Sequence, residues 1–202
     1  MTNRLKRILI WLSRIDKCRG FGIQSPWAYA MATNVINANS HADVCEILKR
    51  KHHYSDVEYR RLCELMYRLA DELQPSVIVN ADDTYIISGD YLQSGCCTAR
   101  YEVVDKDFTK QQVSDALLKE NGLIMCHING CSDIRGKVSL LSEYATDGSL
   151  IMVEGIYESR KNRDAWADIV NNMPNVVTFD LYYCGLIFFD KKRYKQNYII
   201  NF

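Results

Sequence analysis

After Pro75 the chain alternates short, mostly apolar runs with helical segments, and this alternation restricts the fold more than any other feature of the sequence. The apolar runs cover residues 77–79, 101–104, 123–126 and 150–153, and the helical segments end at Leu92 or cover residues 110–119, 137–144 and 162–171. Strands that are apolar along nearly their whole length and are separated by helices typically form a parallel sheet with helices on both faces. The sequence therefore predicts a doubly wound α/β fold.

The last strands break this alternation. Residues 176–179 and 186–189 are both β-rich, and they lie on either side of the short segment 182–185. Two such runs around a short connection indicate an antiparallel hairpin. We therefore expect a mostly parallel sheet that ends in an antiparallel hairpin.

The chain before Pro75 has helical signals only. Ser25 and Pro26 form an N-cap and first turn for a helix over residues 25–38. Ser55 and Glu58 have the spacing of a capping box, and the helix that follows has an apolar face from Val57 to Leu73. We expect an N-terminal helical cap over residues 1–74 and a core over residues 75–202, joined in one compact unit.

The first helix is amphipathic and basic. Leu5, Ile8, Leu9, Leu12 and Ile15 recur at helical spacing, with lysines and arginines between them. This pattern suits either packing against the domain or a weak contact of the segment from Leu5 to Ile15 with an anionic membrane surface. The first interpretation is favoured here because most amphipathic helices pack on their own domain, and no apolar run approaches the length of a membrane span.

Composition narrows the partners and the compartment. The formal net charge is zero, which argues against nucleic-acid binding even though Lys191–Lys195 lies near several tyrosines. Those tyrosines also suit a hairpin edge or a surface for a protein partner or self-association. The eight cysteines are scattered through predicted helices and strands, which favours free thiols and a cytoplasmic location over a disulfide scaffold.

Several short segments resemble class I S-adenosylmethionine-dependent methyltransferases. The segment from Gly22 to Trp27 resembles the Gly-x-His-Ser-Pro-Phe segment of one subgroup, with Gln24 in place of the histidine. The segments 150–156, 165–166, 179–181 and 185–189 resemble the last strands and hairpin of that family. The resemblance covers roughly residues 21–189 and implies a Rossmann-like fold with S-adenosylmethionine as the family's cofactor.

The cofactor turn of that family is altered in this chain. The first strand is followed by Asn80-Ala81-Asp82-Asp83-Thr84-Tyr85-Ile86, and no glycine occurs before Gly89. The family needs glycines here because the cofactor lies against the backbone. Asp82 and Ile86 stand at the glycine positions, and a carboxylate about 4 Å from the cofactor's own carboxylate would be repelled by roughly 1–4 kcal/mol. We expect no cofactor to bind here in the usual way. Asn80 and Asp82 are the candidate cofactor-binding residues of this turn.

The remaining motif positions are partly changed. Asp105 follows the second strand, where an acidic side chain could bind ribose hydroxyls or simply form a turn. Asn129 replaces an aspartate of the family and cannot act as a base, and Glu154 stands where the family tends to have paired aspartates. The resemblance makes Asn129 and Glu154 the candidate catalytic residues, and the loss of paired carboxylates predicts no metal site.

Cys126, His127 and Cys131 do not have a recognised zinc-ligand spacing. Because neighbouring strand residues point to opposite faces, we interpret Cys126 as a core residue and His127 as a residue at the rim.

Two functions from different classes remain open. The first is a catalytically degenerate methyltransferase-like protein without a cofactor, which acts as a binding or scaffold protein. The second is an active O-methyltransferase with an atypical cofactor loop, in which Asp105 binds ribose and Glu154 is the base.

Overall fold

Seven strands form one mixed sheet in the computed structural model, which describes residues 3–20, 22–38, 43–54, 57–82, 85–117, 121–129 and 132–202. Their order is β2-β1-β3-β4-β6-β5-β7. The strands are β1 (Val77–Ala81), β2 (Arg100–Val104), β3 (Ile124–Ile128), β4 (Leu150–Glu154), β5 (Val176–Asp180), β6 (Cys184–Phe189) and β7 (Gln196–Ile199). β6 is antiparallel to both of its neighbours, and the other pairings are parallel. The predicted doubly wound fold and its antiparallel hairpin are confirmed.

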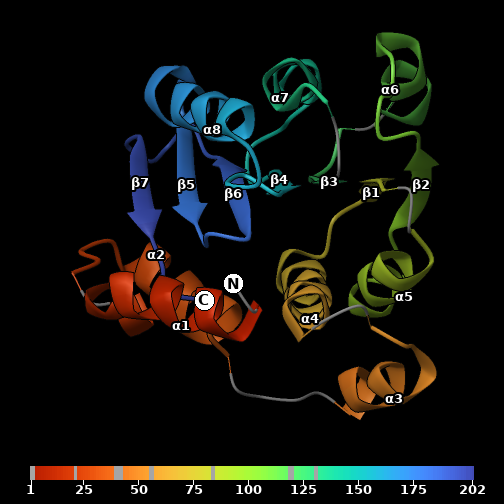
Figure 1. Ribbon diagram of the computed structural model, residues 1–202. Helices are drawn as coiled ribbons and strands as arrows, with labels where there is room; N and C mark the ends of the chain where they lie inside the picture. The colour runs from red at the N-terminus through yellow and green to blue at the C-terminus, as the bar shows by residue number, and fades with distance from the viewer. Residues whose placement is uncertain are drawn as a thin grey trace.

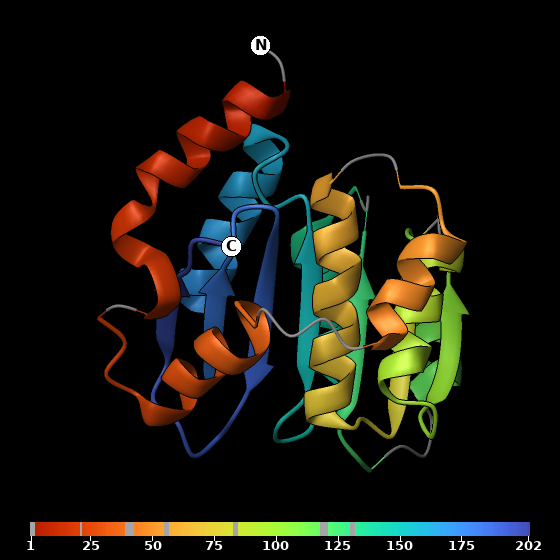
Figure 2. The same ribbon diagram turned by 90° about the horizontal axis from the view of Figure 1, so that it is seen from below.

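Helices cover both faces of the sheet (Figure 1). One face carries α6 (Lys110–Leu117), α7 (Ile134–Ser142) and α8 (Arg160–Asn172). The other face carries the N-terminal helices and α5: α1 (Asn3–Ser13), η1 (Ile15–Gly20), α2 (Pro26–Ala30), η2 (Met31–Ile36), α4 (Val57–Leu73) and α5 (Tyr85–Gly95). Figure 2 looks onto this second face, with α4 crossing the middle of the sheet. α3 (Asp43–Lys51) packs on the outer side of α4 and α5 through Cys45 and Leu48.

The sheet divides two apolar clusters. Ile78, Met125 and Met152 pack against α2, η2 and α4, whereas Val79, Cys126 and Ile151 pack against α6, α7 and α8. Every residue of β1, β3, β4 and β5 is buried, which explains why these strands could be recognised as nearly continuous apolar runs.

Some local predictions need correction. The helix predicted over residues 25–38 begins at the expected N-cap, where Ser25 Oγ accepts from the Ala28 amide, but its second half is π-helical. Arg68 of α4 donates to the carbonyls of Val35 and Ile36 at the end of this π-helical part. The helix from Val57 to Leu73 is confirmed, although Val57 itself is exposed. Ser55 of the predicted capping box lies outside the described residues.

β2 is the edge strand on its side of the sheet, and only α6 lies between β2 and β3 in the described part of the chain. The common doubly wound order has a further strand outside this position. The short connection therefore corresponds to a sheet that is trimmed at this edge. At the opposite edge, β7 adds a strand parallel to β5 that the sequence did not indicate.

The interpretation of the first helix as packed by its apolar face is wrong. Arg14, one residue beyond α1, fixes the segment to the domain, with Nη2 2.8 Å from Asp180 Oδ1 and Nη1 3.0 Å from the Asp180 carbonyl oxygen. The apolar side chains are about half exposed instead of buried at Ile8, Leu9, Trp11, Leu12 and Ile15.

Candidate functional site

The direction in which successive strands are added to the sheet reverses at β1. From β1 the chain continues outward to β2, and β3 then pairs with the other side of β1. In open α/β sheets this switch point is where ligands bind, outside the carboxyl ends of the strands. The residues at the end of β1 and β3 are Asn80 to Asp82 and Ile128 to Asn129.

Asn80 is the centre of a polar network on this side of the sheet. It is fully buried, and its Nδ2 lies 3.0 Å from Ser88 Oγ and 2.8 Å from the Tyr101 hydroxyl. Its Oδ1 lies 2.6 Å from His127 Nδ1. Asn80 and His127 are paired in register on β1 and β3, so their side chains leave the same face of the sheet.

The network extends to both sides. Ser88 Oγ donates to Asp82 Oδ2 at 3.0 Å, and Asn129 Nδ2 donates to Asp82 Oδ1 at 3.3 Å. On the other side, His127 Nε2 lies 2.8 Å from Glu154 Oε1 at the end of β4. Asp82, Ser88, His127 and Glu154 are all buried, so the polar atoms are satisfied by one another.

These bonds define where the protons lie. Ser88 is the donor in its bond to Asp82, so its single hydroxyl proton points to Asp82. Ser88 must then accept from the Asn80 amide, which turns Asn80 Oδ1 toward His127. Because Oδ1 is an acceptor, His127 Nδ1 carries a proton.

It follows that His127 and Glu154 share one further proton between Nε2 and Oε1. The pair is either an imidazolium with a carboxylate or a neutral imidazole with a carboxylic acid, and it has no net charge in both forms. Glu154 is the predicted catalytic residue, and in the structure its carboxyl group is bonded to a buried histidine. The bond to His127 fixes the position of the Glu154 carboxyl group, and its Oε1 is already bonded to the imidazole.

The predicted site residues are distributed unequally. Asn80, Asp82, Asn129 and Glu154 lie in one connected network through Ser88 and His127. Asp105 stands apart, exposed beyond the end of β2, and its Oδ1 accepts from the Asp107 amide at 2.7 Å. Asp105 therefore forms a turn, which was one of its two predicted roles. Ile86 is exposed in the first turn of α5, and Asp83 lies outside the described residues.

Sequence reasoning missed the residues that connect the network. His127 was interpreted as a residue at the rim, which is wrong, because its side chain is fully buried and bonded at both nitrogens. The prediction that Cys126 and His127 face opposite sides is confirmed, since Cys126 packs in the cluster under α6, α7 and α8. Burial also raises the pKa of the Cys126 thiol to about 12, so this thiol stays protonated at neutral pH.

Two side chains of the loop before α4 form hydrogen bonds with α5. His52 Nε2 lies 2.8 Å from Asp90 Oδ2, and the hydroxyl groups of Tyr54 and Tyr91 lie 2.5 Å apart. Lys51 and His52 hold the pKa of Asp90 below its usual value. His53, between His52 and Tyr54, is exposed.

Among the described residues, no group of three or more histidine, cysteine, aspartate or glutamate side chains could hold a metal ion. Cys45, Cys63, Cys96, Cys97, Cys126 and Cys184 are free thiols.

No protein-family model matches the chain, and no curated protein matches it. Solved structures do match. An O-methyltransferase from Bacillus cereus in complex with SAH has a TM-score of 0.50 and 10% identity, over 79% of this chain and 94% of that one. The O-methyltransferase TomG from Streptomyces achromogenes in complex with SAM has a TM-score of 0.49 and 11% identity, over 81% of this chain and 95% of that one. The likeness to the Bacillus cereus protein extends over most of this chain and of that one, and this chain therefore has the Rossmann-like fold of class I S-adenosylmethionine-dependent methyltransferases.

Proposed function

We propose that this chain is a catalytically degenerate methyltransferase-fold protein that acts as a binding or scaffold protein and does not bind S-adenosylmethionine at the switch point. One observation carries the proposal: the Asn129 side chain donates to the Asp82 carboxylate, which links the ends of β3 and β1 across the position where this fold binds ligands. The polar groups that would receive a cofactor are bonded to one another.

The chemistry of the turn after β1 supports the same proposal. A bound cofactor needs glycines there and a site for its own carboxylate, whereas this chain has the buried carboxylate of Asp82. Binding would break the Asp82–Asn129 and Asp82–Ser88 bonds and place two carboxylates together. The residues present therefore do not fit the cofactor in its usual position.

Calorimetric titration of the protein with S-adenosylmethionine and S-adenosylhomocysteine tests this proposal. We expect no binding heat and no change in unfolding temperature at millimolar ligand. A ligand present at 100 times its dissociation constant would stabilise the folded state by about 2.7 kcal/mol, which melting curves detect easily. Micromolar binding of either compound would overturn the proposal.

The second candidate is an active O-methyltransferase, and the position of Asp105 favours it. Asp105 is exposed at the carboxyl end of β2, next to β1, which is where an acidic side chain binds ribose in this fold. If titration detects binding, Asp105→Ala should weaken it by about tenfold, the loss of one charge-assisted hydrogen bond. Asp115→Ala, an exposed aspartate on α6, is the matched control and should leave the affinity unchanged.

A further inference from the structure

Helix α1 carries its large apolar side chains on the outside of the molecule. Ile8, Leu9, Trp11, Leu12 and Ile15, the last just beyond the helix, are 47–54% exposed. Ile8, Leu12 and Ile15 follow one another at the spacing of one helix face, and Trp11 lies beside them. Arg14, which is anchored to Asp180, holds the segment with this face turned outward.

An outward apolar face of this kind is a candidate interaction surface. Monomeric proteins rarely expose contiguous apolar patches larger than on the order of a few hundred Å², and larger ones mark interaction sites. The fold leaves about half of each of these side chains exposed, and α1 lies along the outer edge of the molecule (Figure 2). We call the five side chains between Ile8 and Ile15 the α1 patch.

The charge of the segment indicates the kind of partner. The first twenty residues contain Arg4, Lys6, Arg7, Arg14, Lys17 and Arg19 against a single acidic residue, Asp16. Arg14 is bound to Asp180 and Lys17 to Asp16, and a symmetric contact with α1 of a second copy would bring the other four like charges together. An anionic bilayer surface instead attracts basic residues at the flanks of an apolar helix face.

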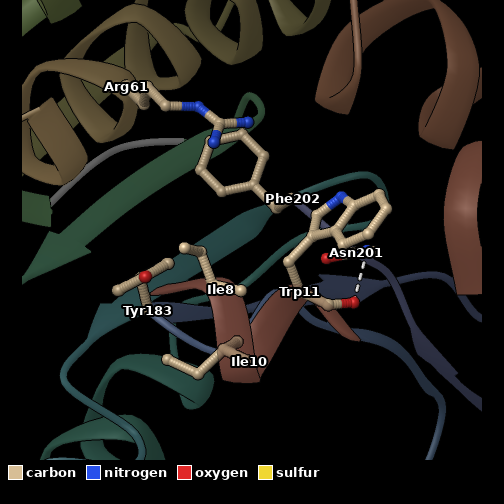
Figure 3. Close-up of a pocket in the computed structure, with 7 residues that line it drawn as sticks. All are labelled: Ile8, Ile10, Trp11, Arg61, Tyr183, Asn201 and Phe202. Carbon is tan, nitrogen blue, oxygen red and sulfur yellow. Dashed lines mark hydrogen bonds between the residues drawn. The ribbon is translucent and has the colours of Figure 1, made fainter. Parts of the chain in front are cut away.

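The region beside α1 has the same combination of apolar and cationic groups. Ile8, Trp11, Tyr183 and Phe202 line a pocket of about 360 Å³, and the Arg61 guanidinium lies 4.7 Å from the centre of the Phe202 ring (Figure 3). Arg61 comes from α4, so a cationic group from outside the first helix stands next to the α1 patch. Trp11, with an apolar ring and a polar N–H, is a residue type enriched at membrane interfaces.

We propose that α1 lies in the plane of an anionic lipid bilayer surface, with the α1 patch inserted among the acyl chains and the neighbouring basic side chains at the lipid phosphates. None of the described helices is long and apolar enough to cross a bilayer. The contact is therefore interfacial, and it does not depend on whether the crevice binds a cofactor.

Co-sedimentation with vesicles tests this proposal. We expect the protein to bind vesicles of phosphatidylcholine and phosphatidylglycerol at low salt, to bind phosphatidylcholine alone much more weakly, and to be released as salt is raised. Binding should shift the Trp11 fluorescence to shorter wavelength. Trp11→Phe should remove this shift, because Trp166 is already buried and Trp27 packs against Phe179 and Phe188 of the sheet.

Leu12→Asp should lower vesicle affinity by about tenfold or more, since it removes one inserted large side chain. Ile47→Asp, at an exposed apolar residue of α3, is the matched control and should bind like the wild type. Both positions are exposed, so circular dichroism should show the same fold for all variants.

Three results would overturn the proposal: no binding to anionic vesicles at low salt, equal binding to neutral vesicles, or unchanged binding of Leu12→Asp. Light scattering adds a fourth test. A dimer that dissociates in Leu12→Asp would show that the α1 patch binds a second copy of the chain instead.

Discussion

The amide oxygen of Asn80 lies 2.6 Å from Nδ1 of His127, and both side chains are fully buried although the residues are 47 positions apart. This contact joins β1 to β3 at the point where the sheet would open to a ligand. A catalytic site keeps polar groups available for its substrate, whereas these two side chains bind each other. The contact thus supports a structural role for the polar residues at the switch point.

Asn80→Ala should lower the free energy of unfolding by about 2–3 kcal/mol. The substitution leaves His127 Nδ1 without its acceptor and deprives Ser88 and Tyr101 of a donor, all on the buried side of β1. Urea unfolding measures the change, with Asn171→Ala at an exposed position of α8 as the control. Residues that serve ligand binding often lower the stability of the folded protein. If Asn80→Ala were as stable as the wild type or more stable, this result would contradict a structural role of Asn80.

His127 should carry a proton on Nδ1, which faces the amide oxygen of Asn80. The bonds from Asp82 through Ser88 to Asn80 place an acceptor oxygen opposite this nitrogen. Long-range ¹H–¹⁵N correlation spectra of the imidazole distinguish a protonated from an unprotonated Nδ1. An unprotonated Nδ1 in the spectrum would show that the Asn80 amide is turned the other way and that the order of donors is reversed.

The same network shows how far sequence reasoning reaches. Asn80, Asp82, Asn129 and Glu154 could be identified because each stands at the end of a predicted strand, where this fold gathers polar residues. Ser88, Tyr101 and His127 could not, since their partners depend on which strands pair and in which register. The pairing of Asn80 with His127 is known only once β1 and β3 are placed side by side.

The fold follows the same rule. The predicted strands β1, β3, β4 and β5 are buried along their whole length, and their burial is the reason that the apolar runs exist. β2 was predicted as well, although it is partly exposed. β7 was not predicted because Gln196–Ile199 is mostly exposed at the sheet edge and shows no clear alternation of apolar and polar residues. α3 escaped for a similar reason, as Cys45 and Leu48 are its only buried residues.

Arg14→Ala should detach the N-terminal segment and lower the free energy of unfolding by about 3 kcal/mol. Arg14 and Asp180 are 11% and 4% exposed, and loss of one partner of a buried ion pair leaves the other charge uncompensated. The substitution should increase the rate of amide hydrogen exchange more in α1 than in the sheet. Lys17→Ala is the matched control, because Lys17 pairs with Asp16 at the surface and should contribute less than about 1 kcal/mol. Equal effects of the two substitutions would contradict the anchoring role of Arg14.

Tyr157 makes the stability of the protein depend on pH in the alkaline range. Burial and the adjacent Asp180 carboxylate, which accepts from the Tyr157 hydroxyl at 2.6 Å, raise the pKa of Tyr157 from 10.0 to about 12. Between these values the phenol ionises in the unfolded chain but stays protonated in the folded one. Unfolding therefore becomes more favourable, and the contribution of Tyr157 is present below pH 10 and is lost as the pH rises toward 12.

Tyr157→Phe should consequently lose less stability than the wild type between pH 10 and pH 12, although it is less stable at neutral pH because the bond to Asp180 is missing. Guanidinium unfolding at several pH values measures both effects. Tyr194→Phe, at a tyrosine that is 91% exposed, is the control and should follow the wild type over the whole range. If Tyr157→Phe and the wild type fall in parallel above pH 10, the Tyr157 phenol has the same pKa in the folded and unfolded chain, and its bond to the Asp180 carboxylate does not hold the proton.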